Sequence, residues 1–219
     1  MLKLEKITKN YFANKSKTTV LNNISIKINQ GDLITIYGKS GSGKTTLLSI
    51  AGTMLSPDSG KIYLNDKEID SKTNINSIRQ KLISFIFQDH CLLPEYNMLE
   101  NIMLPSLITG KGYKESKESA LSLLDLFDLQ SIKSRYPNET SRGEKQRISL
   151  LRALINKPKI IFADEPTGNL DKTNCELLLN LIVKINKDTD TTFVIATHDK
   201  SFAKVSDITY NLNNGLLTK

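Results

Sequence analysis

The sequence predicts an α/β protein with a mostly parallel sheet, an N-terminal antiparallel β layer and an inserted helical sub-domain. Three observations support this class: alternating apolar residues near the N-terminus, recurring short apolar runs of buried-strand type, and a central stretch with helical spacing. Strands that alternate with helices favour a parallel sheet. A length of 219 residues can bury one full core, so a single domain over residues 1–219 is expected.

The N-terminal stretch alternates in the manner of strands. Three apolar sets occur at residues 2–7, 24–28 and 33–36, and turn residues at Asn22-Asn23 and at 29–32 separate them. This pattern predicts antiparallel strands that lead into one buried strand.

Helical and strand-like patterns divide the rest of the chain. Apolar residues between Asp89 and Ile155 fall at helical spacing, which predicts the inserted sub-domain over about 89–155. Outside this segment, helices are expected over 45–53 and 177–185, and strands over 61–64, 82–87, 160–163 and 192–196.

Composition disfavours several classes of protein. No apolar run approaches the roughly 18 to 20 residues of a membrane span, and residues 1–7 lack the apolar segment of a signal peptide, so a cytoplasmic location is expected. The net charge is +7, but the lysines are scattered singly, which argues against a nucleic-acid partner. Cys91 and Cys175 have no metal-binding or disulfide pattern and are expected to be free thiols.

A glycine-rich segment carries the clearest chemistry. It matches the phosphate-loop pattern G-x-x-x-x-G-K-[ST] and lies between a predicted strand and a predicted helix. Its glycines let successive backbone N–H groups turn toward phosphate oxygens, and the helix N-terminus adds a favourable dipole. Lys44 can neutralise the β- and γ-phosphates of ATP, and the Thr45 hydroxyl can ligate Mg²⁺. The nucleotide-binding residues expected here are Gly38, Lys39, Ser40, Gly41, Ser42, Gly43, Lys44, Thr45 and Thr46.

Two adjacent carboxylates follow a second buried strand. The apolar run 160–163 leads directly into Asp164 and Glu165, at the strand end where ligands bind in open parallel sheets. Adjacent side chains point in different directions. Asp164 can therefore hold Mg²⁺ while Glu165 orients and polarises the water that attacks the γ-phosphate.

With these motifs the chain resembles the ATPase subunits of ABC transporters over essentially its whole length. Further segments carry the resemblance: Tyr11, Gln88 after a predicted strand, residues 140–147 ahead of a helix, Gly168-Asn169-Leu170-Asp171, and His198 after the last buried strand. The resemblance implies a P-loop NTPase core with the ABC ATPase fold. It implies that Tyr11 stacks on adenine, that Gln88 senses Mg²⁺ and the membrane partner, and that His198 contacts the γ-phosphate.

The segment 140–147 stands at the position of the family's signature motif, usually Leu-Ser-Gly-Gly-Gln/Glu, and departs from it. Thr140 replaces Leu and Arg142 replaces the first Gly. If that glycine needs a positive φ, an arginine there costs of order 1 kcal/mol or more, and we hypothesise that it slows hydrolysis or tightens regulation without abolishing hydrolysis. The resemblance implies that the retained Ser and Gly contact the nucleotide of the opposite subunit; the expected trans-subunit residues are Ser141, Arg142, Gly143, Glu144 and Asp171.

The resemblance also implies how such a chain assembles. Each chain holds two half-sites on different faces, so Mg-ATP joins two copies into a dimer and hydrolysis releases them. The dimer drives a separate integral membrane permease. This implies a peripheral location at the cytoplasmic face of the inner membrane, without insertion of the chain itself.

Two stretches, residues 87–105 and 164–171, resemble the branch of the family that serves lipoprotein-releasing, macrolide-export and cell-division complexes. Lipoprotein release is the favoured interpretation. Antimicrobial-peptide or macrolide export and cell division are the alternatives, and a non-transport ABC ATPase or a P-loop kinase are the alternatives from other classes. The apolar residues Leu92, Leu93, Tyr96 and Met98 belong either to a partner-binding patch or to the core.

Overall fold

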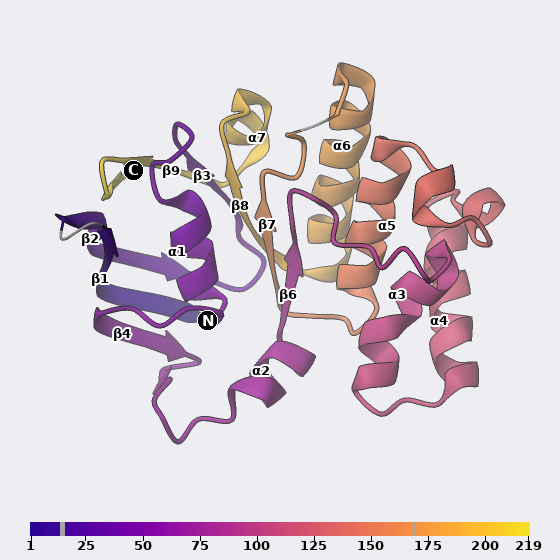
Figure 1. The fold of residues 1–219 in the computed structure, drawn as a ribbon, viewed down its shortest axis with the longest axis horizontal. Helices are drawn as coiled ribbons and strands as arrows, with labels where there is room; N and C mark the ends of the chain where they lie inside the picture. The colour runs from indigo at the N-terminus through magenta and orange to yellow at the C-terminus, as the bar shows by residue number, and fades with distance from the viewer. Residues whose placement is uncertain (14–15, 169) are drawn as a thin grey trace.

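The fold, seen in a computed structural model that describes residues 1–13, 16–168 and 170–219, is built on two β-sheets. Figure 1 shows an N-terminal sheet at one end, strands β3 and β6 to β9 in the middle, and a group of three helices at the other end. The mixed architecture confirms the predicted α/β class.

The first sheet is the predicted antiparallel layer. In the described part of the chain it contains four strands in the order β2-β1-β4-β5. Their bounds are Leu2–Ala13 (β1), Ser16–Ile28 (β2), Ser59–Leu64 (β4) and Lys67–Glu68 (β5). Alternate side chains of β1 and β2, such as those of Leu4 and Ile26, are buried, as the alternation predicts.

One turn predicted in this layer is wrong. Residues Asn22-Asn23 do not end a strand, because β2 continues through them. Asn23 adopts a φ of 54°, and the pairing register between β1 and β2 shifts between Ile7 and Lys9. Since asparagine tolerates the left-handed region, these turn-favouring residues are accommodated in a β-bulge.

The second sheet has the order β10-β9-β3-β8-β7-β6 among the described residues. Its strands are Leu33–Tyr37 (β3), Ile83–Ile86 (β6), Ile160–Asp164 (β7), Thr192–Thr197 (β8), Ile208–Asn213 (β9) and Leu216–Thr218 (β10). The pairs β3–β8, β3–β9, β6–β7 and β7–β8 are parallel, and β9–β10 is antiparallel. The carboxyl ends of β3, β7 and β8 therefore meet at one edge.

Helices cover both faces of this sheet. On one face, α1 (Lys44–Ala51) packs with Phe162 and Val194 of the strands, and on the other, α6 (Lys172–Thr189) packs with Ile161 and Ile195. The strands are thus buried on both sides, which explains their continuous apolar runs. Two short helices, α2 (Ile75–Lys81) and α7 (Lys200–Val205), complete this part.

Three helices in the segment 89–155 share a separate apolar cluster, which includes Ile102, Leu124 and Ile148. They are α3 (Met98–Ile108), α4 (Tyr113–Leu126) and α5 (Arg142–Leu154), with 3-10 turns at Gln130–Ile132 and Pro137–Glu139. The four apolar residues before and at the start of α3 divide between surface and core: Leu93 and Tyr96 are exposed, Leu92 is half-buried and Met98 is fully buried.

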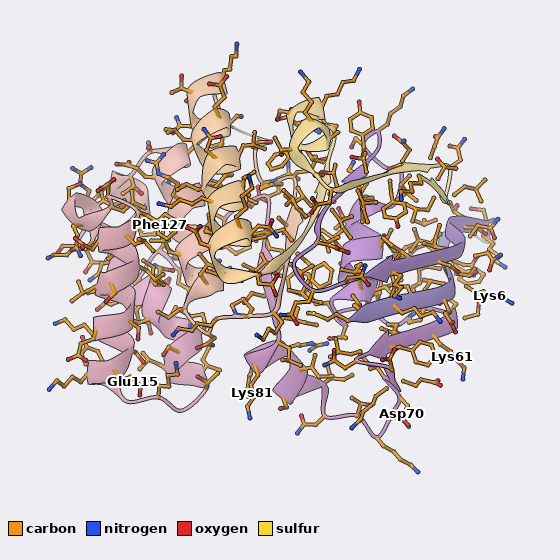
Figure 2. The ribbon with its side chains drawn as sticks, turned by 180° about the vertical axis from the view of Figure 1, so that it is seen from behind. Lys6, Lys61, Asp70, Lys81, Glu115 and Phe127 are labelled. Carbon is orange, nitrogen blue, oxygen red and sulfur yellow. The ribbon has the colours of Figure 1, made fainter. Side chains whose placement is uncertain are left out.

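None of the described helices is both long and apolar enough to cross a bilayer. Figure 2 shows the labelled charged side chains Lys6, Lys61, Asp70, Lys81 and Glu115 at separate places along the outer edge of the molecule. Cys91 and Cys175 are free thiols, and Cys91 is exposed.

Candidate nucleotide-binding and hydrolysis site

The glycine-rich segment 38–46 connects β3 to α1 in a conformation suited to an anion. Gly41 and Gly43 have φ values of 77° and 102°, where a side chain would be strained. Within the described residues, the backbone N–H groups of Gly41, Gly43, Lys44 and Thr45 have no recorded acceptor. Unpaired donors at a helix N-terminus fit the oxygens of a phosphate chain.

The Lys44 ammonium group folds back over this loop. Its Nζ donates to the carbonyl oxygens of Gly38 at 2.9 Å and Lys39 at 3.1 Å, and lies 3.1 Å from Glu165 Oε1. The Lys44 side chain is 5% exposed and that of Glu165 is 13% exposed. The two carbonyl oxygens and the carboxylate oxygen surround the ammonium group in the way that phosphate oxygens would, so bound phosphates could replace them.

Asp164 and Thr45 form a second part of the site. The Thr45 hydroxyl donates to Asp164 Oδ2 at 2.7 Å, which joins the start of α1 to the end of β7. The other oxygen, Oδ1, is buried and has no hydrogen-bond partner among the described residues. Burial raises the pKa of the Asp164 carboxyl, and the Thr45 hydrogen bond opposes this shift. A hydroxyl beside an unpaired carboxylate oxygen fits the oxygen-ligand chemistry of Mg²⁺.

Glu165 points away from Asp164, toward β8. Its Oε2 accepts hydrogen bonds from Thr197 Oγ1 at 3.2 Å, from the His198 backbone N–H at 3.3 Å and from His198 Nδ1 at 2.8 Å. Glu165 itself has a φ of 44°, an uncommon conformation that occurs at functional sites. The structure thus brings Lys44, Glu165 and His198 into one connected group at the carboxyl edge of the sheet.

Sequence reasoning missed Thr197 in this group. Its hydroxyl contacts Glu165 and also accepts from the backbone N–H of Asp199, so it fixes the strand end that presents His198. Thr197 is the last residue of the buried strand β8 and directly precedes His198, and this position in the sequence could have identified it as a site residue.

Gln88 and Tyr11 lie at the margins of the site. A Cβ atom placed on Gly168 would lie 3.6 Å from Gln88 Nε2 and 3.5 Å from Glu165 Cβ, so the Gln88 amide lies beside the loop that follows Glu165. Tyr11 is 45% exposed on β1 and pairs with Thr18 of β2. Its exposed ring is available to a base, but no recorded contact joins it to the phosphate loop.

The signature segment lies elsewhere. In Figure 1 the start of α5 and the start of α1 lie on opposite sides of strands β6 to β8. Ser141 caps α5: its Oγ accepts from the Glu144 backbone N–H, and Glu144 Oε2 accepts from the Ser141 backbone N–H. This capping box presents the α5 N-terminus, with Ser141 and Arg142 exposed.

The segment predicted from the resemblance at 168–171 is the position of the family's D-loop. Its residue Asp171 is linked to the signature segment through Asn174, which sequence reasoning also missed. Asp171 caps α6 and accepts from the Asn174 backbone and side-chain N–H groups at 3.0 and 2.6 Å, and Arg147 donates to Asn174 Oδ1 at 3.1 Å. A Cβ atom on Gly143 would lie 2.3 Å from Asn174 Oδ1. Gly143 is therefore required by this close approach of α5 to α6. Asn169 of the D-loop lies outside the described residues.

The backbone strain expected at Arg142 is absent. Arg142 is the first residue of α5 and has no positive φ, so an arginine fits this position without a backbone penalty. The condition for strain, a positive φ at position 142, is not met, because the capping Ser141, in extended conformation with φ −68° and ψ 161°, makes the change of direction before the helix.

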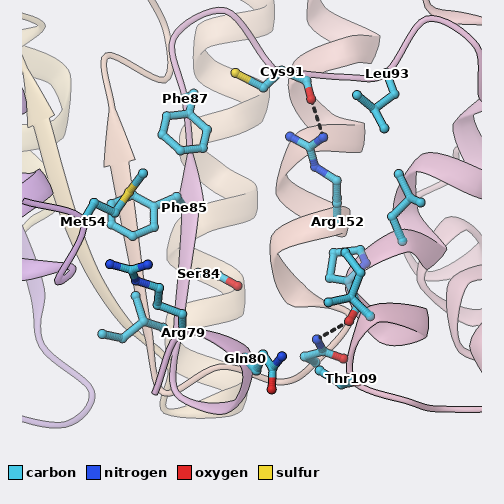
Figure 3. A pocket seen from close by; sticks show the side chains of 15 residues that line it. Met54, Arg79, Gln80, Ser84, Phe85, Phe87, Cys91, Leu93, Thr109 and Arg152 are labelled. Atoms are coloured by element: carbon cyan, nitrogen blue, oxygen red, sulfur yellow. Dashed lines mark hydrogen bonds between the residues drawn. The ribbon is translucent and has the colours of Figure 1, made fainter. Parts of the chain in front are cut away.

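A groove of about 530 Å³ lies between strand β6 and the helices α3 and α5, with residues of α2 also in its lining (Figure 3). Phe85 and Phe87 form one side, and Leu93 and Arg152 lie on the other. The rings of Phe85 and Phe87 stack with centroids 5.6 Å apart. The groove begins where the Gln88 segment leaves β6, so it adjoins the hydrolysis site.

Comparison with known proteins agrees with this geometry. The family described as ABC transporter matches residues 21–168. The chain is 42% identical over 221 residues to the lipoprotein-releasing system ATP-binding protein LolD of Bacteroides thetaiotaomicron, covering 100% of both chains. It is 41% identical over 213 residues to the protein of that name from Buchnera aphidicola subsp. Schizaphis graminum, covering 96% of this chain and 93% of the relative.

Solved structures show the same likeness. The ATP-binding cassette MJ0796, as a dimer in a post-hydrolysis state bound to ADP and Pi, superposes with a TM-score of 0.91 at 33% identity, covering 100% of this chain and 98% of that one. A family match over most of the chain, full-length relatives, and a phosphate loop beside paired acids all lead to one assignment. The chain belongs to the ABC transporter family and is one of its ATP-binding, ATP-hydrolysing proteins.

Proposed function

We propose that the chain is the ATP-hydrolysing subunit of an ABC transporter complex that releases lipoproteins from the inner membrane. The observation that carries hydrolysis is the convergence of Lys44, Thr45, Asp164, Glu165 and His198 at one sheet edge. Lipoprotein release is supported by relatives of that name, which are similar to this chain over its whole length.

In this proposal the residues 38–46 bind the phosphate chain, and Tyr11 stacks on the adenine. The unpaired N–H groups of the loop and the Lys44 ammonium group neutralise the phosphate oxygens. Glu165 orients and polarises the attacking water once Lys44 has moved from its carboxylate to the phosphates. His198, already bonded to Glu165, holds that carboxylate and donates to the γ-phosphate.

Thr45, Asp164 and Gln88 are the proposed Mg²⁺ residues. The unpaired Asp164 Oδ1 and the adjacent Thr45 hydroxyl supply the two oxygens that are already close together, and the Gln88 amide lies beside Gly168. Mg²⁺ held by these residues would supply the positive charge that neutralises the leaving phosphate group.

The exposed N-terminus of α5 is proposed to complete the site of a second copy. Ser141, Arg142, Gly143, Glu144 and Asp171 would contact the nucleotide held by the partner subunit's phosphate loop. The separation of α5 from α1 within one chain supports this arrangement, as does the dimeric state of MJ0796. Hydrolysis would then open the dimer.

The groove beside Phe87 is the proposed docking site of the permease. It has an apolar lining, and its edge includes Ile108, which is 69% exposed. Exposed apolar surface of this kind marks an interface. Docking there would hold the chain peripherally at the cytoplasmic face of the inner membrane. We also propose that residues 89–155, which have their own apolar cluster, form the sub-domain that carries this contact.

Affinity purification from detergent-solubilised membranes tests the proposal. Tagged wild-type chain is expected to retain an integral membrane permease and to hydrolyse ATP in that complex. Ile108→Asp is expected to lose the permease. Leu216→Asp, at a similarly exposed apolar residue on β10, is the matched control and should retain it. Purification of the wild-type chain without any membrane protein would contradict the proposal, and a co-purifying exporter or division protein would contradict the lipoprotein assignment.

A further inference from the structure

Two consecutive residues that follow Gln88 have a left-handed backbone. The φ values are 61° at His90 and 49° at Cys91. Residues with a Cβ atom are destabilised in this region, so two in succession need contacts that hold them. The segment itself supplies two backbone hydrogen bonds, from the His90 N–H to the Phe87 carbonyl and from the Cys91 N–H to the Asp89 carbonyl, and contacts from outside the segment add to these.

One face of α5 supplies the contacts. Arg152 donates from Nη2 to the His90 carbonyl at 2.6 Å and from Nη1 to the Cys91 carbonyl at 2.5 Å. Ser149 Oγ donates to the same His90 carbonyl at 3.3 Å, and the Gln146 side-chain oxygen is hydrogen-bonded to His90 Nδ1. Positions 146, 149 and 152 recur at intervals of three and lie along one side of the helix.

Two of these three side chains are fully buried, and Arg152 is half-buried. Gln146 is 1% exposed and Ser149 is 0% exposed. Burial lowers the pKa of the Arg152 guanidinium, and none of the described carboxylates forms an ion pair with it. The two carbonyls instead accept hydrogen bonds from the half-buried Arg152 guanidinium, and charge-assisted bonds of this kind are strong. Such an arrangement fixes the segment firmly against α5.

The contacts between α5 and the segment after Gln88 connect three functional parts of the molecule. The first turn of α5 carries the signature residues, whereas the held segment begins at Gln88, beside Gly168, and continues into the groove wall at Leu93. Figure 3 shows Arg152 in that wall, bonded to Cys91. A displacement of the wall would therefore move both Gln88 and the α5 N-terminus.

We propose that Gln146, Ser149 and Arg152 are positioning residues that lock the Gln88–Cys91 segment to the signature helix, so that the two move as one rigid unit. This inference rests on the proposed function, because it explains how that site responds to an occupant of the groove. The three residues are not among those proposed to bind nucleotide or to activate water; in this proposal they set where Gln88 lies relative to Glu165.

The variant Arg152→Lys, made in the purified full chain, tests whether these contacts position the Gln88–Cys91 segment. Lysine keeps the positive charge but lacks the planar fork that reaches two carbonyls. The kcat for ATP hydrolysis is expected to fall about tenfold, the size of effect expected for loss of a charge-assisted hydrogen bond. Affinity for a fluorescent ADP analogue should stay unchanged, because the phosphate loop makes no contact with Arg152.

A second substitution distinguishes a positioning role of Arg152 from a general loss of stability in the Arg152→Lys variant. Glycine adopts a positive φ without strain, so Cys91→Gly should restore most of the kcat lost in Arg152→Lys. Asp128→Gly, at another residue with φ of 55° but outside the segment, is the matched control and should not restore it. Restoration by both glycines, or by neither, would overturn the proposal.

Hydrogen exchange covers the case in which Arg152→Lys folds poorly. Ser149→Ala removes one bond to His90 with little change in volume, and it is expected to speed amide exchange across residues 90–93 and to lower kcat in the same direction by a smaller factor. Unchanged exchange there would overturn the lock. A wild-type chain that hydrolyses no ATP would instead contradict the proposed function, whereas full activity of Arg152→Lys beside an active wild type contradicts only the lock.

Discussion

The Nζ atom of Lys44 lies 3.1 Å from Glu165 Oε1, while the other oxygen of the same carboxylate lies 2.8 Å from His198 Nδ1. Glu165 thus bridges the phosphate-loop lysine and the histidine at the end of β8. The carboxylate proposed to orient water is paired with a cation, and that cation is the one expected to bind phosphate. Nucleotide binding therefore has to break this ion pair before Glu165 can act.

The ion pair predicts that removing the Glu165 charge favours nucleotide binding. Glu165→Gln leaves Lys44 with carbonyl partners only, so a fluorescent ATP analogue should bind the monomer about fivefold more tightly, corresponding to ~1 kcal/mol. The exposed Glu95→Gln is the control for loss of one negative charge elsewhere. Weaker binding by Glu165→Gln than by the control would show that the pair does not oppose the nucleotide.

Asp164→Asn should stabilise the protein without nucleotide while removing its response to Mg²⁺. Burial raises the Asp164 pKa from its ordinary 3.8. Protonation of Asp164 therefore stabilises the folded protein at pH values below the ordinary pKa. This stabilisation is lost as the pH rises through the raised pKa of the folded state. At pH 7 the neutral amide of Asp164→Asn avoids the cost of burying a charged carboxylate. The Tm of the variant should therefore exceed that of the wild type by a few degrees, and this difference should shrink at acid pH.

The same variant has a second readout. Adding Mg-ATP should raise the Tm of the wild type by mass action but leave that of Asp164→Asn close to the value with ATP alone. Differential scanning calorimetry at pH 4 and pH 7 measures both effects. An equal rise with Mg-ATP in the two proteins would remove Asp164 from the metal site.

Gly143→Ala should weaken the contact between the signature and the D-loop. The new methyl group would lie 2.3 Å from Asn174 Oδ1, so Asn174 has to leave Arg147 or Asp171. We expect a loss of about 1 to 3 kcal/mol in stability, the usual cost of overpacking, and a lower ATPase rate. Gly112→Ala, where a methyl group meets open space, is the matched control. Equal unfolding midpoints in urea for the two variants would contradict the packing argument.

Arg142→Gly should not accelerate hydrolysis through relief of strain. Arg142 is already in a helical conformation, so glycine there only lowers helix stability, by about 0.5 to 1 kcal/mol relative to alanine. Arg142→Ala removes the same side chain and serves as the comparison. A partner-stimulated ATPase rate that rises in the Gly variant but not in the Ala variant would restore the strain hypothesis.

Local motifs made much of the fold and site predictable. The phosphate loop and the acids at 164 and 165 follow buried apolar strands, and both the strand pattern and the motif are contained within a few residues. The helices of the segment 89–155 could be predicted because their apolar residues recur at regular helical spacing.

Other features depend on contacts between distant parts of the chain. The ion pair joins Lys44, the first residue of α1, to Glu165, the residue that follows β7, and no local pattern relates the two. The bond between Arg152 and His90 crosses 62 positions, and it contacts a left-handed turn from a helix that no local pattern relates to it. The helices α2 and α7 have 7 and 6 residues, which is too short for a clear helical period.

Size-exclusion chromatography of Glu165→Gln with Mg-ATP tests the central claim that ATP joins two copies through composite sites. A chain that binds ATP but cannot hydrolyse it should elute as a dimer with Mg-ATP and as a monomer with Mg-ADP. Adding Ser141→Arg, which places a bulky side chain at the α5 cap, should return it to a monomer. A Glu165→Gln protein that binds ATP yet stays monomeric at concentrations well above its nucleotide Kd would contradict the claim.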